Sequence, residues 1–373
     1  MSEIRKPLRP ALCTYLGAAL LSMLALFTHP AAALEVDSRS AVIFAYNRIG
    51  EDAYPSSSLR IEQFEDQLKE LKAGGYTVKP LTEILKNFEQ GIVMPPKTVA
   101  LTFDGGHASF LYNAVPLLEK NHIPYTVFIS PGHTQKETGP YVGWDDLRRL
   151  KKSGLATIGL HPATYTRLAD NSDEEIRRQV NSAIVRYREE LGGEPEVFAY
   201  PFGEYSRSYR DIIAASGFKA AFGQQSGAAW EGADMFALPR FAMTERYGDI
   251  ERFRLAAAAL PLPLSDIVPE DPHLNTLTPS IGFTVPQSVA RQLDDLSCFI
   301  TGQSAPVVER IDNRIELRLN EPLSQDRVRV NCTLPGPANE DIDGPPHWRW
   351  LGLLLTIPLS LLPPEDPDEP LEP

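Results

Sequence analysis

Short apolar segments alternate with helical patterns between Val42 and about Pro261, and this alternation limits the possible folds more than any other feature. The runs AVIFAY (41–46), TVALTF (98–103) and YTVFIS (125–130) are typical of buried strands. Amphipathic segments that end at glycines lie between such runs. Because apolar strands separated by helices form parallel sheets with covered faces, we expect an α/β domain built as a parallel sheet or a barrel.

The longest of these helices is predicted directly after Asn171. Ser172 and Glu175 have the spacing of a capping box, and the apolar residues that follow recur on one helical face before two glycines. A pattern with both a start and a stop signal predicts one continuous helix here.

The first 33 residues have the organisation of a secretory signal peptide. Three basic residues precede an apolar stretch at 11–27, and the alanines at 31–33 offer a cleavage site. The alternative is an uncleaved membrane anchor. We assign 1–33 to the signal peptide and expect an extracytoplasmic location, periplasmic or secreted, with no stable transmembrane segment after cleavage.

Net charge and cysteine content indicate which partners and which covalent cross-link to expect. The formal net charge of −13 argues against a nucleic-acid partner, because phosphate binders are basic. One of the three cysteines lies in the signal peptide, which leaves Cys298 and Cys332. Export and an even count favour a disulfide between them, although two buried free thiols are the alternative.

The sequence changes character after residue 260. Residues 261–280 are rich in proline and predict a linker. Alternating apolar and polar residues in 281–362, separated by turn signals, predict a small antiparallel β-sandwich. The acidic, proline-rich residues 363–373 are typical of a disordered tail. A structural or docking role, with a protein or a glycan as partner, stays open for the β domain.

Three predicted strands end in residues suited to a functional site. Asp104 and His161 each follow an apolar run, and a third run leads into the turn formed by Pro201, Phe202 and Gly203. Sites in α/β folds lie at the C-terminal ends of strands, so these residues are candidates to share one pocket. A turn-forming aspartate and a structural histidine are the alternatives.

The motifs TVALTFDGG, ATIGLHPATYTRL and FAYPFGEYSRSY occur in that order. Together they resemble the polysaccharide deacetylase family, whose NodB-homology domain (carbohydrate esterase family 4-like) is a distorted (β/α) barrel. The resemblance covers roughly residues 40–245, and we assign 36–260 to this barrel.

The resemblance implies roles for individual residues. Asp104 matches the general base of the family, and His161 matches one of two metal-binding histidines. The second aspartate of the first motif, a metal ligand in the family, is Gly105 here, and the second histidine is Tyr165. The metal triad is therefore degraded, and Tyr165 could instead donate a hydrogen bond to an oxyanion.

Two further sets of candidates complete the predicted site. His107 follows the glycine turn and could join Asp104 and His161 in a displaced site for a divalent metal such as zinc, or it could be an ordinary exposed residue at a helix start. Substrate-binding candidates offer apolar faces and a turn for sugar rings, with core packing as the alternative; they are Tyr46, Tyr200, Pro201, Phe202 and Gly203.

These observations support three hypotheses about function. The first is an exported hydrolase that cleaves the carbon–nitrogen amide bond of an acetylated N-acetylhexosamine polysaccharide. The second is a catalytically inactive, glycan-binding pseudoenzyme that needs no metal. The third is a metal-independent amide hydrolase on the same fold.

Overall fold

The computed structural model describes residues 31–134, 139–337 and 347–363. Almost all of the predicted signal peptide and of the predicted acidic tail lies outside these ranges. Within them, no helix combines the length and the apolar character that crossing a membrane requires.

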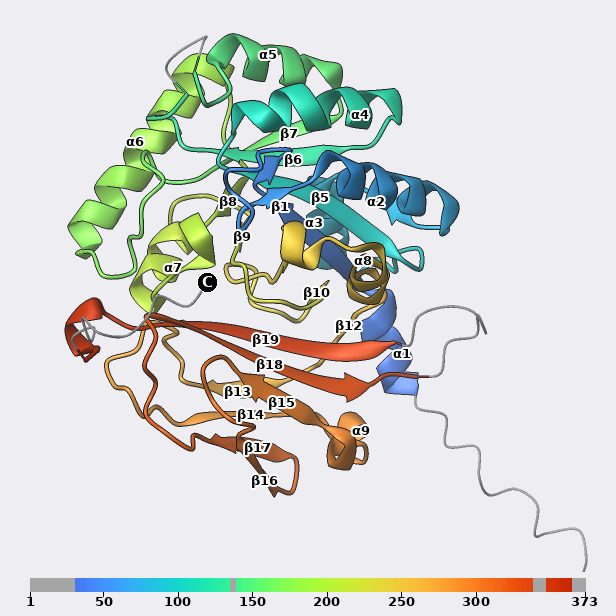
Figure 1. Cartoon of the computed structure of the whole chain (residues 1–373), viewed down its shortest axis with the longest axis vertical. Coiled ribbons are helices and arrows are strands. Elements are labelled where there is room, and N and C mark those ends of the chain that lie inside the picture. The colour runs from blue at the N-terminus through green and yellow to red at the C-terminus, as the bar shows by residue number, and fades with distance from the viewer. Residues whose placement is uncertain (1–30, 135–138, 338–346, 364–373) are drawn as a thin grey trace, which may run out of the picture. The chain divides into compact units, whose positions relative to one another are not determined.

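A nine-stranded sheet forms the N-terminal domain and curls into a distorted barrel (Figure 1). Its strand order is β10-β1-β5-β6-β7-β8-β9, with β11 paired to β1 and β4 to β5. Neighbouring strands are parallel except for the β1–β10 pair. The predicted α/β barrel is confirmed. Its strands are β1 (Ser40–Tyr46), β4 (Thr77–Val78), β5 (Thr98–Asp104), β6 (Tyr125–Ile129), β7 (Ala156–Leu160), β8 (Val197–Ala199), β9 (Ala220–Phe222), β10 (Ala229–Trp230) and β11 (Phe241–Ala242).

The segment from Leu238 to Ala242 links the two ends of this curled sheet. Leu238 pairs with Phe222 of β9, and Phe241 pairs with Phe44 of β1. A residue of this segment that points inward therefore meets side chains from both ends of the sheet.

Helices cover the outside of the sheet, as Figure 1 shows for α2, α4, α5 and α6. The Ser172 hydroxyl accepts a hydrogen bond from the Glu175 amide and caps α6, as predicted. The helix α5 ends at Gly154, whose left-handed conformation (φ +76°) suits glycine. The helices are α1 (Ala31–Ser38), α2 (Ile61–Ala73), α3 (Leu81–Gln90), α4 (Val115–Lys120), α5 (Trp144–Ser153), α6 (Asp173–Leu191), α7 (Arg207–Ala214) and α8 (Ile250–Ala257).

Alternation along the strands separates two sets of core residues. Leu101 and Phe103 of β5 pack in the large cluster that includes the helices. Ala100 of the same strand packs instead with Phe128 and Phe222 in a second cluster. Successive side chains of a strand point to opposite faces, so Asp104, four residues after Ala100, lies on that second, inner face.

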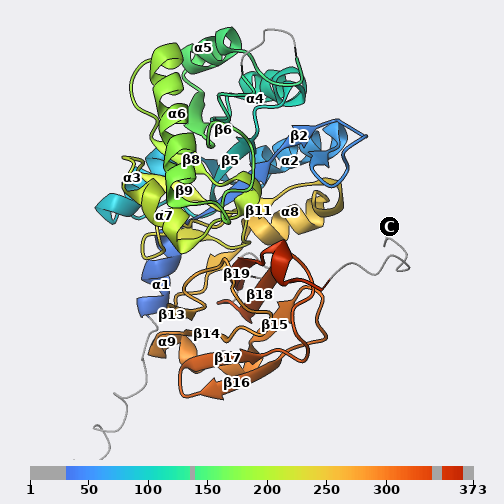
Figure 2. The same cartoon turned by 90° about the vertical axis from the view of Figure 1, so that its left-hand side faces the viewer.

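Two four-stranded sheets form the C-terminal domain, in the orders β12-β19-β18-β15 and β13-β14-β17-β16. Figures 1 and 2 show them as two layers, and side chains of both build one apolar core. The prediction of a small all-β domain is confirmed. Its elements are β12 (Leu260–Pro261), β13 (Ser265–Val268), β14 (Ile281–Thr284), α9 (Gln287–Ala290), β15 (Ser297–Ile300), β16 (Val307–Ile311), β17 (Arg314–Arg318), β18 (Arg327–Pro335) and β19 (Trp348–Thr356); a small parallel pair, β2 (Arg48–Ile49) and β3 (Ser58–Leu59), lies in the N-terminal domain.

The prediction that 261–280 is only a linker is wrong. The strand β12 pairs with β19, and β13 pairs with β14, so this segment adds a strand to each C-terminal sheet. Both strands lie at the edge of their sheets. An edge strand tolerates proline because one side of its backbone needs no ladder hydrogen bond.

Cys298 of β15 and Cys332 of β18 occupy directly opposite positions and form a disulfide. The bond closes a loop across a sequence separation of 34 residues, which restricts the unfolded chain. We expect Cys298→Ala/Cys332→Ala to lose about 2 to 4 kcal/mol in free energy of unfolding, measured by urea denaturation. Reductant should destabilise the wild type and leave the double variant unchanged; an equal response of both proteins would contradict the prediction.

Candidate functional site

Asp104, the last residue of β5, forms a buried ion pair with Arg240. The Oδ1 and Oδ2 atoms of Asp104 lie 2.7 and 2.8 Å from the two terminal nitrogens of Arg240. The side chains are 1% and 0% exposed, respectively. Gln224, which follows β9, donates a further hydrogen bond of 3.2 Å to Oδ2. A residue that follows β9 and a residue that precedes β11 thus converge on the carboxylate at the end of β5.

Arg240 has further contacts besides Asp104. It donates to the Gly223 carbonyl and to the Thr102 hydroxyl, at 2.9 and 3.0 Å. Its guanidinium also lies 5.4 Å from the ring centre of Phe128. Burial alone would raise the pKa of Asp104, but the charge and hydrogen bonds of Arg240 outweigh it and lower that pKa. The pair is therefore ionised within an apolar barrel interior.

His161, which follows β7, has both ring nitrogens engaged by the backbone. Nε2 accepts a hydrogen bond of 3.1 Å from the Gly105 amide, so Nδ1 carries the proton and donates to the Ala199 carbonyl at 2.7 Å. Burial lowers the pKa of His161 to about 4. A neutral imidazole therefore links the ends of β5, β7 and β8.

His107 lies in the space that a side chain at Gly105 would need. A Cβ added to Gly105 would come within 2.8 Å of His107 Nε2. His107 is 6% exposed, and its buried Nδ1 has no hydrogen-bond partner among the described residues. Burial lowers its pKa to about 4. The alternative of an exposed helix-start residue is therefore wrong, because the missing side chain at Gly105 lets the imidazole move inward.

Tyr165 lies beside His161, as the resemblance to the second family motif implies. The two rings are 4.7 Å apart in an edge-on arrangement, and the Tyr165 hydroxyl accepts a hydrogen bond of 3.5 Å from the Phe202 amide. Burial raises the pKa of Tyr165, so its hydroxyl keeps its proton. Phe202 packs edge-on against the Tyr165 ring at 4.9 Å.

Two predicted sugar-binding residues are core residues instead. Tyr46 is 1% exposed, stacks on Phe103 and donates its hydroxyl hydrogen to Gln67. Tyr200 is fully buried and donates to the Phe236 carbonyl. Strand alternation points both rings away from the inner face that holds Asp104.

The three residues of the predicted turn at 201–203 differ in burial. Pro201 and Gly203 are buried, whereas Phe202 is half-buried with a positive φ of +59°. This backbone conformation brings the Phe202 ring against Tyr165. These two residues form the edge of the site, which we call the rim. Phe202 is therefore the predicted substrate-binding residue whose placement fits that role best.

Arginines of the C-terminal domain contact the same rim. Arg327 donates to the Phe202 carbonyl, and Arg329 donates to the Gln224 carbonyl at 2.9 Å. Burial lowers the pKa of Arg329 to about 10. The strand β18 thus anchors the two loops that flank Asp104 and Tyr165.

Arg240 and Gln224 lie outside the sequence motifs that predict the site. One signal was available for Arg240: an arginine in the middle of the apolar run ALPRFAM needs a buried partner. Gln224 lies in a polar loop with no comparable signal.

The geometry agrees with comparisons to known proteins. Residues 92–221 match the family model for polysaccharide deacetylase. A poly-beta-1,6-N-acetyl-D-glucosamine N-deacetylase of Staphylococcus aureus (strain MSSA476) is 24% identical over 199 residues, covering 50% of this chain and 68% of the relative. The enzyme of the same name from Staphylococcus epidermidis is 22% identical over 236 residues, covering 57% and 81%.

Solved structures share the fold of the barrel. The deacetylase PplD of Streptococcus pyogenes, in complex with acetate, superposes with a TM-score of 0.53 at 20% identity and covers 57% of this chain and 96% of its own. IcaB from Ammonifex degensii superposes with a TM-score of 0.51 at 23% identity and covers 56% and 94%.

A curled parallel sheet with Asp104 and His161 at its strand ends defines a NodB-homology barrel. Over this barrel the chain is similar to the polysaccharide deacetylase family, whose model it matches at residues 92–221. Its named relatives are N-deacetylases, hydrolases that act on carbon–nitrogen bonds other than peptide bonds.

The family is generally metal-dependent, but the donor atoms at this site do not fit a divalent cation. Nε2 of His161 is bound by the Gly105 amide, and both Asp104 oxygens are bound by Arg240. Among the described residues, no three His, Cys, Asp or Glu side chains are placed to hold a metal ion. The predicted displaced site of Asp104, His107 and His161 is therefore not formed, because the Gly105 amide binds Nε2 of His161 and the Arg240 guanidinium binds both oxygens of Asp104.

Proposed function

We propose that the protein hydrolyses the acetamide groups of an N-acetylhexosamine polysaccharide outside the cytoplasm, releasing acetate and leaving a free amine on the sugar. Support comes chiefly from the position of the family match, since residues 92–221 include Asp104, His161 and Tyr165 at one end of the barrel. The names of the relatives support poly-N-acetylglucosamine as the substrate class.

Two side chains could take part directly in this reaction. Oδ1 of Asp104 accepts one hydrogen bond, from Arg240, and a carboxylate oxygen can accept two. A water at the second position would lose its proton to Asp104 as it attacks the acetyl carbon, and Asp104 would give that proton to the sugar nitrogen as the carbon–nitrogen bond breaks. The protonated Tyr165 hydroxyl, at the rim, would donate a hydrogen bond to the oxyanion that forms.

A second candidate function is glycan binding without turnover. It is favoured by the closed network, because Asp104 is 1% exposed and paired, and both nitrogens of His161 are bound. In this case the rim around Phe202 and Tyr165 would hold the sugar while no base is free to activate water.

An acetate-release assay on poly-N-acetylglucosamine, combined with glycan binding, separates the two functions. We expect the full chain to release acetate, Asp104→Asn to lower the rate about 100-fold, and Tyr165→Phe to lower it about tenfold, because each removes a group used in the transition state. Tyr112→Phe, on a side chain that is 70% exposed, is the matched control and should not change the rate. Binding without acetate release by the wild type would establish the second function.

A further inference from the structure

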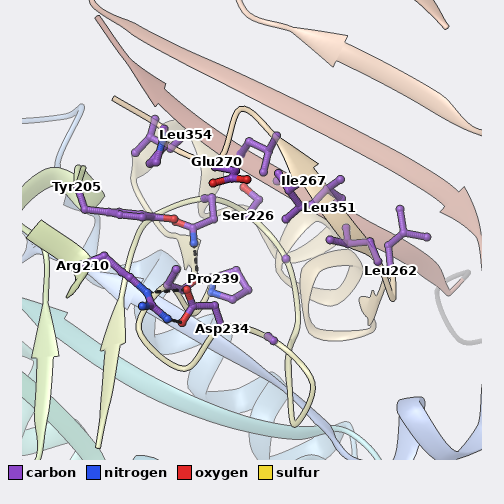
Figure 3. Close-up of a pocket in the computed structure, with 18 of the residues that line it drawn as sticks. Tyr205, Arg210, Ser226, Asp234, Pro239, Leu262, Ile267, Glu270, Leu351 and Leu354 are labelled. Carbon is purple, nitrogen blue, oxygen red and sulfur yellow. Dashed lines mark hydrogen bonds and ion pairs between the residues drawn. The ribbon is translucent and has the colours of Figure 1, made fainter. Parts of the chain in front are cut away.

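A cavity of about 530 Å³ lies where the loop after β9, the start of α7, the β12–β13 segment and β19 meet (Figure 3). Its volume lies within the range of about 300 to 1,000 Å³ that is typical of small-ligand sites. Asp104, His161 and Tyr165 do not line it. The cavity is therefore separate from the site described above.

One wall of the cavity is apolar. Leu262 and Ile267 of the segment 260–268 and Leu351 and Leu354 of β19 line it, as Figure 3 shows. The N-terminal side contributes Tyr205, whose ring stacks on Tyr200 with centres 4.8 Å apart. Aliphatic and aromatic surfaces of this kind pack against the C–H faces of sugars.

Charged residues also line the cavity, and its arginines are already bound. Arg210 makes two hydrogen bonds of 2.8 Å to the carboxylate of Asp234 (Figure 3). Arg207 forms an ion pair with Glu270. An anionic ligand would have to break one of these pairs before it could bind a guanidinium.

The lining of the cavity carries a net negative charge. Four carboxylates and two guanidinium groups belong to it, and they are Asp211, Asp234, Asp266, Glu270, Arg207 and Arg210. Arg210 pairs with both Asp211 and Asp234, and Arg207 pairs with Glu270. Gln225 also lines the cavity; its Nε2 donates to the Ala237 carbonyl, while its buried Oε1 has no hydrogen-bond partner in the part of the chain that the structure describes. Surplus acceptors and negative charge favour a ligand that carries a positive charge and several donors.

We propose that this cavity binds a hexosamine unit with a free amine, the sugar that de-N-acetylation leaves. Its ammonium group would lie near the carboxylates, its hydroxyls would donate to acceptors of the lining such as Oε1 of Gln225, and its apolar face would pack against Tyr205 and the leucines. The identity of the ligand rests on the proposed function, because that reaction converts a neutral acetamide into a cation.

Calorimetry on the full chain tests this choice of ligand. The probes are a glucosamine pentamer, an N-acetylglucosamine pentamer and a neutral alkyl glycoside, each titrated at low and high salt. We expect the glucosamine pentamer to bind at least about tenfold more tightly than the other two, with an advantage that shrinks as salt screens the carboxylates. Equal or tighter binding of the acetylated pentamer or the alkyl glycoside that Ile267→Trp weakens would overturn the proposal.

Three variants test whether the glucosamine pentamer binds in this cavity. Ile267→Trp fills the cavity and should weaken glucosamine-pentamer binding at least about tenfold, whereas Asp266→Asn should weaken it about threefold by removing one negative charge. Asp294→Asn, on a side chain that is 86% exposed outside the cavity, is the matched control and should bind like the wild type. Wild-type affinity in Ile267→Trp would place the ligand elsewhere and refute the proposal.

Acetate release by the same proteins separates the two proposals. If the wild type releases acetate but Ile267→Trp binds the pentamer normally, the cavity proposal fails and the proposed function stands. If no acetate is released but pentamer binding is lost in Ile267→Trp, the cavity is an amino-sugar site and the proposed function fails.

Discussion

The Arg240→Met variant is expected to lose about 3 to 5 kcal/mol in free energy of unfolding, measured by urea denaturation at pH 7. The wild-type pair is almost completely buried, and each Asp104 oxygen is bound by a guanidinium nitrogen. Removing the guanidinium leaves a carboxylate in an apolar interior, with the Gln224 amide as its remaining side-chain donor. The carboxylate must then either stay charged without a partner or take up a proton, and both cost free energy.

A second variant and a control make this expectation specific. Arg240→Met/Asp104→Leu should recover most of the loss, because it removes both charges and leaves apolar groups in their place. Arg318→Met breaks the exposed pair with Glu309 and should cost less than about 1 kcal/mol. If Arg240→Met cost no more than Arg318→Met, the buried pair would not be a main support of the barrel.

The sequence predicts the barrel well because each strand and helix is indicated by a pattern of neighbouring residues. Apolar runs such as 98–103 and 125–130 lie between amphipathic segments, and each became a parallel strand between helices. The C-terminal strands alternate clearly enough to be found as well. The proline-rich segment at 261–280 predicts a linker but contributes edge strands, because proline content does not show whether a segment lies free or pairs at a sheet edge.

The candidate site is predicted only in part, because its hydrogen bonds join distant segments. The strand-end rule predicts that Asp104, His161 and the turn at 201–203 share one end of the barrel, and the family resemblance adds Tyr165. It does not show that a guanidinium 136 residues away binds Asp104. It also does not show that the Gly105 amide binds His161, because this bond depends on backbone direction in a glycine turn. Such contacts decide what the site can bind, and local patterns do not contain them.

The histidines of the site predict a marked dependence of stability on pH. Burial lowers the pKa of both His107 and His161 to about 4, from an ordinary value near 6.5. Between pH 6.5 and 4 the unfolded chain binds protons at these positions that the folded chain does not bind. The free energy of unfolding should therefore fall as pH falls through this window, by roughly 3 kcal/mol for each imidazole. Urea denaturation at pH 7.5, 6.5, 5.5 and 4.5 measures the slope.

Substitution by glutamine separates the two contributions. Since glutamine does not titrate, His161→Gln and His107→Gln should each lose about half of the excess slope below pH 6.5, whatever their stability at pH 7.5. Above pH 7 all curves should run parallel to the wild type, because the imidazoles are then neutral in both states. An unchanged slope in both variants would mean that the acid sensitivity arises elsewhere. A slope lost only in His161→Gln would mean that the His107 ring reaches water, which would make the space beside Gly105 accessible to a ligand.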